Sequence, residues 1–114
     1  MSMKPTQKFL GISVLRDNGF MEEEIKKWID VFNPSQRLPL WEVNHDFHFG
    51  GYAKKNDELE SYCENFFQKT QIVIEPIYTG KMFWGLEKLI EDGYFKPGSK
   101  ILALHTGGLQ YMKE

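Results

Sequence analysis

Two short segments of the sequence combine hydroxyl side chains with glycines, and each follows a run of apolar residues. The first carries Tyr78 and Thr79, and the second carries Thr106 followed by Gly107 and Gly108. If the apolar runs are strands of a parallel sheet, both segments lie beyond the carboxyl ends of strands, where such sheets bind ligands. The glycine pair could cradle a phosphate, but it lacks the GxGxxG and Walker patterns, and the threonine could equally satisfy local backbone groups. These residues by themselves predict a candidate site at the strand ends without naming its chemistry.

Metal and thiol chemistry find little support in the sequence. His45 and His48 flank Asp46, but only Glu42 is nearby as a further ligand and no HExxH pattern exists, so we predict no metal site. Cys63 is the sole cysteine and falls on the apolar face of a predicted helix, which is typical of a core residue rather than a nucleophile. A single cysteine excludes an internal disulfide and favours a cytoplasmic protein.

Hydrophobic periodicity predicts alternating strands and helices. The expected strands cover residues 9–15, 72–74 and 101–104, with a less regular one within 41–49. The expected helices cover residues 21–32, residues 57–69 with Asn56 as N-cap, and a stretch that Thr79 caps and Gly93 ends. Strands and helices in this order are typical of right-handed βαβ crossovers, so we expect an α/β fold with a parallel sheet.

Composition limits the classes of partner. The 114 residues fit one small domain or a piece of a larger one, and a content of 41% hydrophobic and 15% aromatic residues is a heavy load for one small core. Aromatic side chains that this core cannot hold would indicate a partner surface. The formal net charge of −2, without a basic stripe, argues against nucleic acid or an anionic membrane as a partner, and no apolar run reaches membrane-spanning length.

Three motifs, taken in order, resemble one family of enzymes. They are residues 49–52 (FGGY), 74–81 (IEPIYTGK) and 102–108 (LALHTGG). These segments resemble the Gly-Tyr loop, the P-(V/I)-Y-(T/E)-G-K segment and the closing strand with its H-(T/L)-G-G turn in the pyridoxal-phosphate-dependent 1-aminocyclopropane-1-carboxylate deaminase and D-cysteine desulfhydrase family. The likeness extends in register over roughly residues 9–110. It implies a fold-type-II enzyme, in which this chain would form the second half of the large, cofactor-binding domain: a three-layer parallel sheet flanked by helices.

The same resemblance implies an incomplete enzyme. In the family, a lysine early in the chain forms the Schiff base with pyridoxal phosphate, and a Thr-Gly-Ser-Thr-like loop holds the phosphate. Neither motif is found here, and Lys81 matches the lysine of the Y-x-G-K segment instead. We therefore expect residues 1–114 to be a single partial domain, the C-terminal portion of the large domain without the small domain, and to be inactive alone.

Roles for single residues follow from the resemblance. The two that resemble active-site tyrosines are Tyr78, near the substrate and cofactor, and Tyr52, on a mobile loop. Thr106 resembles the residue whose hydroxyl meets the pyridine nitrogen, with Thr79 near the same end of the ring, and Gly107 and Gly108 complete the cofactor-binding turn. Read without the resemblance, both tyrosines could simply be packing residues.

The function that these observations favour is β-elimination or deamination of a small amino acid by a homo-oligomeric parent enzyme. A stand-alone α/β interaction or regulatory module without a cofactor is the alternative from another class. Within the family, the ring-opening deaminases resemble one another in having glutamate where this chain has Thr79 and leucine where it has Thr106. A neutral hydroxyl beside the pyridine nitrogen stabilises its protonated form less than a carboxylate does, which favours desulfhydrase-like elimination over cyclopropane opening.

Overall fold

Three helices and two parallel strands make up the described part of the chain, which in the computed structural model covers residues 7–16, 19–32 and 40–108. In chain order they are β1 (Lys8–Ile12), α1 (Phe20–Phe32), β2 (Leu40–Asn44), α2 (Asp57–Thr70) and α3 (Thr79–Glu91). The two strands pair in parallel, with Lys8 opposite Leu40 and Ile12 opposite Asn44. The α/β class predicted from the sequence is confirmed at this level.

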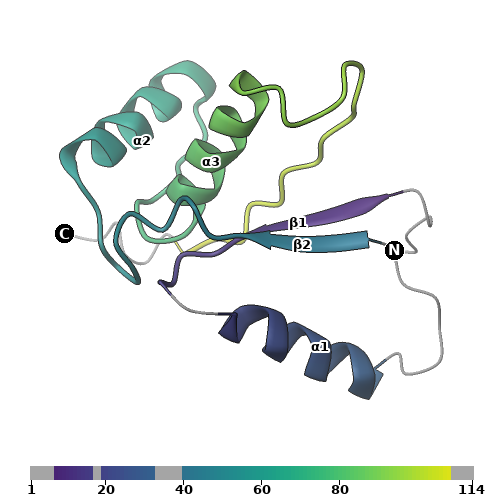
Figure 1. The fold of residues 1–114 in the computed structure, drawn as a ribbon. Helices are drawn as coiled ribbons and strands as arrows, with labels where there is room; N and C mark the ends of the chain where they lie inside the picture. Colours follow the sequence, from purple (N-terminus) through teal and green to yellow (C-terminus); the bar gives the residue numbers. More distant parts are fainter. Residues whose placement is uncertain (1–6, 17–18, 33–39, 109–114) are drawn as a thin grey trace.

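The helices flank the strand pair on two sides. Figure 1 shows α1 on one side of β1 and β2 and α2 and α3 on the other. α1 contacts β2, and α3 contacts β1 and α2. α1 connects two adjacent parallel strands, as the predicted βαβ crossover requires. The predicted strand 9–15 ends earlier than expected, at Ile12, and the loosely predicted strand within 41–49 ends at Asn44.

Helix ends follow local sequence signals. The Asn56 side chain accepts a hydrogen bond of 2.8 Å from the backbone N–H of Leu59, so the predicted N-cap of α2 is confirmed. Gly93, at φ +76°, follows α3 in the left-handed conformation. Its N–H bonds the carbonyl of Ile90 and the next N–H, of Tyr94, bonds that of Leu89, which is the Schellman pattern and confirms the predicted stop.

The start of α3 differs from the prediction. Thr79 is the first helical residue rather than the cap, and Tyr78 occupies the cap position without a side-chain capping bond. The reason is that a carboxylate from farther upstream, that of Glu75, already accepts the first N–H groups of the helix. A threonine hydroxyl at the cap would compete for the same donors.

Two predicted strands have no strand partner within the described residues. Residues 72–74 and 101–104 belong to no helix or strand there. The hydrogen bond of 2.8 Å between His105 Nε2 and the Val73 carbonyl links the two segments. Leu102 and Leu104 are 82% and 70% exposed, although their apolar pattern is that of a covered strand.

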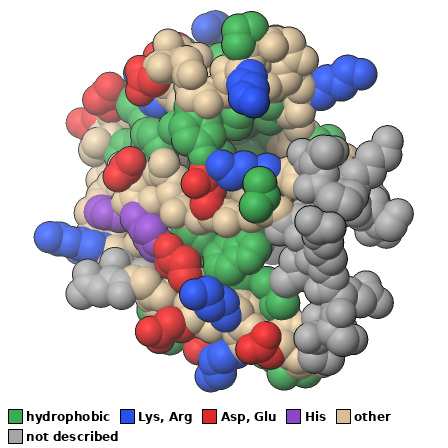
Figure 2. All heavy atoms as spheres, turned by 45° about the vertical axis from the view of Figure 1, so that its right-hand side comes forward, with side chains coloured by type: hydrophobic (Ala, Val, Ile, Leu, Met, Phe, Trp, Pro, Cys, Tyr) green, Lys and Arg blue, Asp and Glu red, His purple; other side chains and the backbone are tan. Residues whose placement is uncertain are grey.

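The core is small and lies between α2 and α3. Its buried centre is Leu59, Cys63 and Ile74, surrounded by partly buried aromatic residues: Phe49, Tyr62, Phe66, Phe83 and Trp84. Cys63 is thus a core residue, as predicted, and burial raises the pKa of its thiol to about 12, which keeps it protonated at neutral pH. Other hydrophobic side chains remain on the surface, and Figure 2 shows some of them open on one face of the molecule.

Candidate functional site

A buried carboxylate organises the N-terminus of α3. Glu75 is 0% exposed, and its two oxygens accept hydrogen bonds from the backbone N–H groups of Ile77 (2.5 Å), Tyr78 (2.9 and 3.1 Å) and Thr79 (2.8 Å). These are donors that a helix leaves without internal partners, and a negative charge is favourable at this end of the helix dipole. The helix terminus is therefore already satisfied by the protein itself.

Thr79 is part of this network. Its side chain is 1% exposed; its hydroxyl accepts a bond of 3.0 Å from the Glu75 N–H and donates one of 3.1 Å to the Glu75 carboxylate. Both roles of the hydroxyl are thus used inside the protein. A contact between Thr79 and a cofactor, which the resemblance implies, stays a prediction and would require this hydroxyl to change partner.

The two tyrosines predicted to be catalytic lie together. The hydroxyl oxygens of Tyr52 and Tyr78 are 2.6 Å apart, so one donates to the other, and their ring centroids are 5.9 Å apart with an interplanar angle of 59°. Tyr78 stands at the start of α3, whereas Tyr52 comes from the loop between β2 and α2. Tyr52 is 49% exposed, whereas Tyr78 is partly buried.

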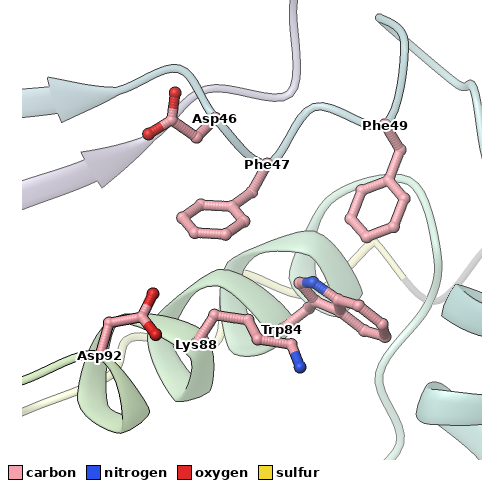
Figure 3. Close-up of a pocket in the computed structure, with 6 residues that line it drawn as sticks. All are labelled: Asp46, Phe47, Phe49, Trp84, Lys88 and Asp92. Atoms are coloured by element: carbon pink, nitrogen blue, oxygen red, sulfur yellow. The ribbon is translucent and has the colours of Figure 1, made fainter.

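One face of α3 holds the loop that carries Tyr52. Four residues of this face follow one another at helical spacing: Lys81, Trp84, Gly85 and Lys88. The Phe49 ring meets Trp84 edge to face at a centroid distance of 5.3 Å, and a Cβ on Gly85 would come within 2.7 Å of the Phe47 ring. Figure 3 shows both phenylalanines pointing from the loop toward α3.

This contact leaves an open pocket beside the loop. Its volume is about 360 Å³, and its lining consists of Asp46, Phe47, Phe49, Trp84, Lys88 and Asp92. The Lys88 ammonium lies over the Trp84 ring, 5.2 Å from the centroid. The Lys88 ammonium therefore covers the Trp84 ring, which is an aromatic wall of the pocket.

The turn formed by residues 105–108 lies against Tyr78. A Cβ on Gly108 would lie 3.4 Å from a carboxylate oxygen of Glu75 and 3.5 Å from the Tyr78 ring, so this turn packs against the start of α3. The turn is shaped by His105, whose Nδ1 accepts from the Gly107 N–H at 3.0 Å. With Nδ1 as the acceptor, Nε2 is the nitrogen that donates to the Val73 carbonyl. Gly107 and Gly108 have φ values of +90° and +83°, which favour glycine at both positions.

Three of the predicted site residues are therefore brought together: Tyr52, Tyr78 and Gly108. Thr106 is exposed on the turn, and nothing lies within 4 Å of the point where a Cβ on Gly107 would stand. Of the three turn residues, only Gly108 is thus placed against Tyr78.

Pyridoxal phosphate is the cofactor that the family resemblance implies for these residues. Contacts of Thr106, Gly107 and Gly108 with its ring-nitrogen end stay a prediction, and of these three residues only Gly108 is placed against the Tyr78 ring. The covalent end needs a lysine amine, and Lys81, the lysine inside the motifs, has its ammonium bonded to the carbonyls of His48 and Gly51. We therefore derive no cofactor step from this chain alone.

The two histidines considered for a metal have other partners. His45 Nε2 contacts both carboxylate oxygens of Glu22, at 3.0 and 2.8 Å, and His48 Nδ1 accepts from the Gly50 N–H at 2.9 Å. Among the residues that the structure describes, no group of three or more ligating side chains could hold a metal ion. Nor is any helix in those ranges long and apolar enough to cross a bilayer.

Sequence reasoning missed Glu75 and Lys81 as site residues. The signal for the first is an acidic residue before Pro76, a few positions upstream of a helix start, where it can reach back to the first N–H groups. The signal for the second is a lysine on the helix face shared with Trp84 and Gly85, which is turned to the protein rather than to solvent.

Comparison with known proteins supports the resemblance seen in the motifs. No protein-family model matches the chain. It is 36% identical over 87 residues to a Pyrococcus furiosus protein named "Putative 1-aminocyclopropane-1-carboxylate deaminase", a match covering 76% of this chain and 26% of that protein. A Pyrococcus horikoshii protein of the same name is 38% identical over 65 residues, 57% of this chain and 19% of its own. A Cryptococcus neoformans protein named "Probable 1-aminocyclopropane-1-carboxylate deaminase" is 34% identical over 62 residues. That match covers 54% of this chain and 18% of the Cryptococcus neoformans protein.

The chain thus spans about a quarter of the length of the Pyrococcus furiosus relative and less of the other two. Over the matched residues, it is homologous to proteins that bear the name of this deaminase.

Proposed function

We propose that this chain is the C-terminal portion of the large domain of a fold-type-II, pyridoxal-phosphate-dependent deaminase or desulfhydrase that acts on small amino acids. The observation that carries the proposal is the contact of 2.6 Å between the hydroxyls of Tyr52 and Tyr78, next to the turn that ends at Gly108. Residues from three separate motifs meet there, and the names of the relatives point to the same chemistry.

Within such an enzyme, pyridoxal phosphate would supply the electron sink for reaction at the amino acid's α-carbon. The part of this chain is to orient the substrate and to move protons. A tyrosine hydroxyl that contacts a second hydroxyl can give a proton to a substrate atom while it accepts one from its neighbour. The exposure of Tyr52 leaves that member of the pair open to a substrate. The 114 residues alone are proposed to be inactive, since Lys81 does not present its amine to the site.

The alternative, a stand-alone interaction or regulatory module, needs neither the tyrosine contact nor the open space at Gly107. It draws on the exposed apolar side chains, such as Leu102, which a partner could cover. The two functions differ in what the tyrosine hydroxyls do: a module would lose nothing when they are removed.

A chimera tests the proposal, in which this chain replaces the matching segment of the Pyrococcus furiosus relative. We expect the chimera to bind pyridoxal phosphate and to turn over a small amino acid. Tyr78→Phe and Tyr52→Phe should each lower kcat about 10²-fold or more while cofactor absorbance is retained, the usual scale for a lost proton-transfer group. Tyr94→Phe, which removes a hydroxyl bonded to Lys8 far from the site, is the matched control. Full turnover after Tyr78→Phe would refute the assignment.

A further inference from the structure

Lys81 is a buried cation that the proposed chemistry does not use. It is 0% exposed, and burial of an ammonium is costly unless its hydrogen bonds are satisfied. Its Nζ donates to the carbonyl of His48 at 2.8 Å and to that of Gly51 at 3.0 Å. Burial lowers the pKa of Lys81, and the nearby Glu75 carboxylate opposes this in part. Both carbonyls belong to one turn of the loop between β2 and α2.

That turn has an unfavourable backbone. Phe49, Gly50 and Gly51 have φ values of +58°, +101° and +130°, and for Phe49 the left-handed region is unfavourable because its Cβ crowds a backbone carbonyl oxygen. Within the turn the Gly51 N–H bonds the His48 carbonyl at 3.2 Å. The two carbonyls converge on the ammonium, whose charge-assisted bonds offset the backbone cost.

The turn leads directly to the catalytic candidate. Tyr52 follows Gly51, the residue that Lys81 holds, and Tyr78 stands three positions before Lys81 at the start of the same helix. One side chain of α3 therefore fixes the loop at the point where Tyr52 leaves it, relative to the helix end that carries Tyr78. The aromatic contacts of Phe47 and Phe49 with α3 hold the loop farther upstream.

We propose that Lys81 is a positioning residue: by bonding the carbonyls of His48 and Gly51, it sets the Tyr52 hydroxyl against that of Tyr78. The value of this role for catalysis rests on the proposed function, but the geometric claim does not. Its test uses the chain alone, without cofactor or substrate, so its failure would leave the proposed function standing.

Photo-oxidation of tyrosine measures this contact. A one-electron oxidant such as photo-excited ruthenium tris-bipyridine with persulfate joins two adjacent tyrosine rings by a carbon–carbon bond, and persulfate takes up the two electrons removed. Peptide mapping identifies the bond between Tyr52 and Tyr78, and a mixture of nitrogen-15-labelled and unlabelled chains separates links within one chain from links between chains. We expect this link within the wild-type chain.

Removal of the ammonium should lower that link selectively. In Lys81→Met, which keeps the length of the side chain, we expect a loss of about tenfold in the Tyr52–Tyr78 link, equivalent to ~1.4 kcal/mol, with an unchanged helical circular dichroism signal. Lys69→Ala, which removes an exposed amine from the last turn of α2, should leave the link unchanged. An unchanged link in folded Lys81→Met would overturn the proposal.

A second variant separates positioning from general support of the fold. In Lys81→Ala, added propylammonium replaces the missing atoms, and 1-propanol of the same length offers no cation. Recovery of the link with propylammonium but not 1-propanol, at a constant helical signal, supports the proposal. If the helical signal is lost in both variants, or returns together with the link, Lys81 supports the whole fold and the positioning role is refuted.

Discussion

At the scale of single residues, the family resemblance implies a difference from ring-opening deaminases in two side chains. This chain has Thr79 and Thr106 where those enzymes resemble one another in having glutamate and leucine. The carboxylate nearest to Thr79 is that of Glu75, and it is occupied by the N–H groups of α3 and by the Thr79 hydroxyl. A neutral hydroxyl beside the cofactor ring stabilises positive charge there less than a carboxylate.

We therefore expect the parent enzyme to eliminate sulfur from D-cysteine faster than it opens 1-aminocyclopropane-1-carboxylate. The good leaving group of the first substrate makes a weaker electron sink sufficient. The measurement is the ratio of kcat/KM for the two substrates in the chimera, before and after Thr79→Glu and Thr106→Leu are introduced together. A higher kcat/KM for the cyclopropane substrate without these changes would rule out the preference.

Lys81 gives a second prediction at this scale. Its pKa in the folded chain is lowered by burial, whereas an unfolded lysine has a pKa of about 10.4. Between the two values the unfolded chain binds more protons, so the free energy of unfolding rises with pH across that window. Relative to Lys81→Met, the wild-type chain should gain stability as the pH is raised from neutral toward about 10. Urea unfolding at several pH values checks this, with Lys88→Met as the control. A difference in unfolding free energy between wild type and Lys81→Met that stays constant or falls as the pH rises would contradict the prediction.

At the scale of elements, the close packing of α2 on α3 depends on Gly80. A Cβ at this position would lie 2.6 Å from the Glu75 carbonyl oxygen and 2.7 Å from Cys63 Sγ, and the Gly80 N–H bonds that same carbonyl at 2.7 Å. Crowding of this kind costs about 1–3 kcal/mol, which exceeds the gain of up to about 1 kcal/mol from alanine in a helix.

We expect Gly80→Ala to destabilise the chain by ~1–2 kcal/mol, measured as a lower urea midpoint. Gly11→Ala is the matched control, because its Cβ would meet Val43 at an ordinary 3.6 Å. Equal urea midpoints for the two variants would show that α2 and α3 leave room for a methyl group at Gly80.

Sequence patterns predict the helices more reliably than they predict the sheet. The three helices and the signals at Asn56 and Gly93 are local, so periodicity and caps predict them. A strand exists only with a neighbour, and residues 72–74 and 101–104 have the composition of strands without a ladder in the described ranges. Glu75 and Lys81 escaped prediction for the same reason, because their roles come from partners that only folding brings near.

At the scale of the molecule, apolar surface remains uncovered. Leu102, Leu104 and Leu40 are between 67% and 82% exposed, and within the described residues the sheet has two strands, each with one edge that no further strand pairs there. Surface of this kind favours association. This surface is the physical basis for expecting the isolated chain to associate with itself.

We expect the isolated chain to self-associate at micromolar concentration. Sedimentation velocity over a dilution series measures this, and a variant with both Leu102→Lys and Leu104→Lys should shift the equilibrium toward monomer. A monomer at every concentration of the series would mean that the isolated chain does not need a second copy to cover its apolar side chains.

The central claim is that this chain supplies the tyrosines and the glycine turn of a pyridoxal-phosphate site but not the amine that binds the cofactor. The most direct test is to incubate the isolated chain and the chimera with pyridoxal phosphate, reduce with borohydride, and map the labelled lysine. We predict stoichiometric label in the chimera on a lysine from the relative's portion, and neither specific label on Lys81 nor amino-acid turnover in the isolated chain. Stoichiometric labelling of one lysine of the isolated chain, together with turnover, would contradict the account.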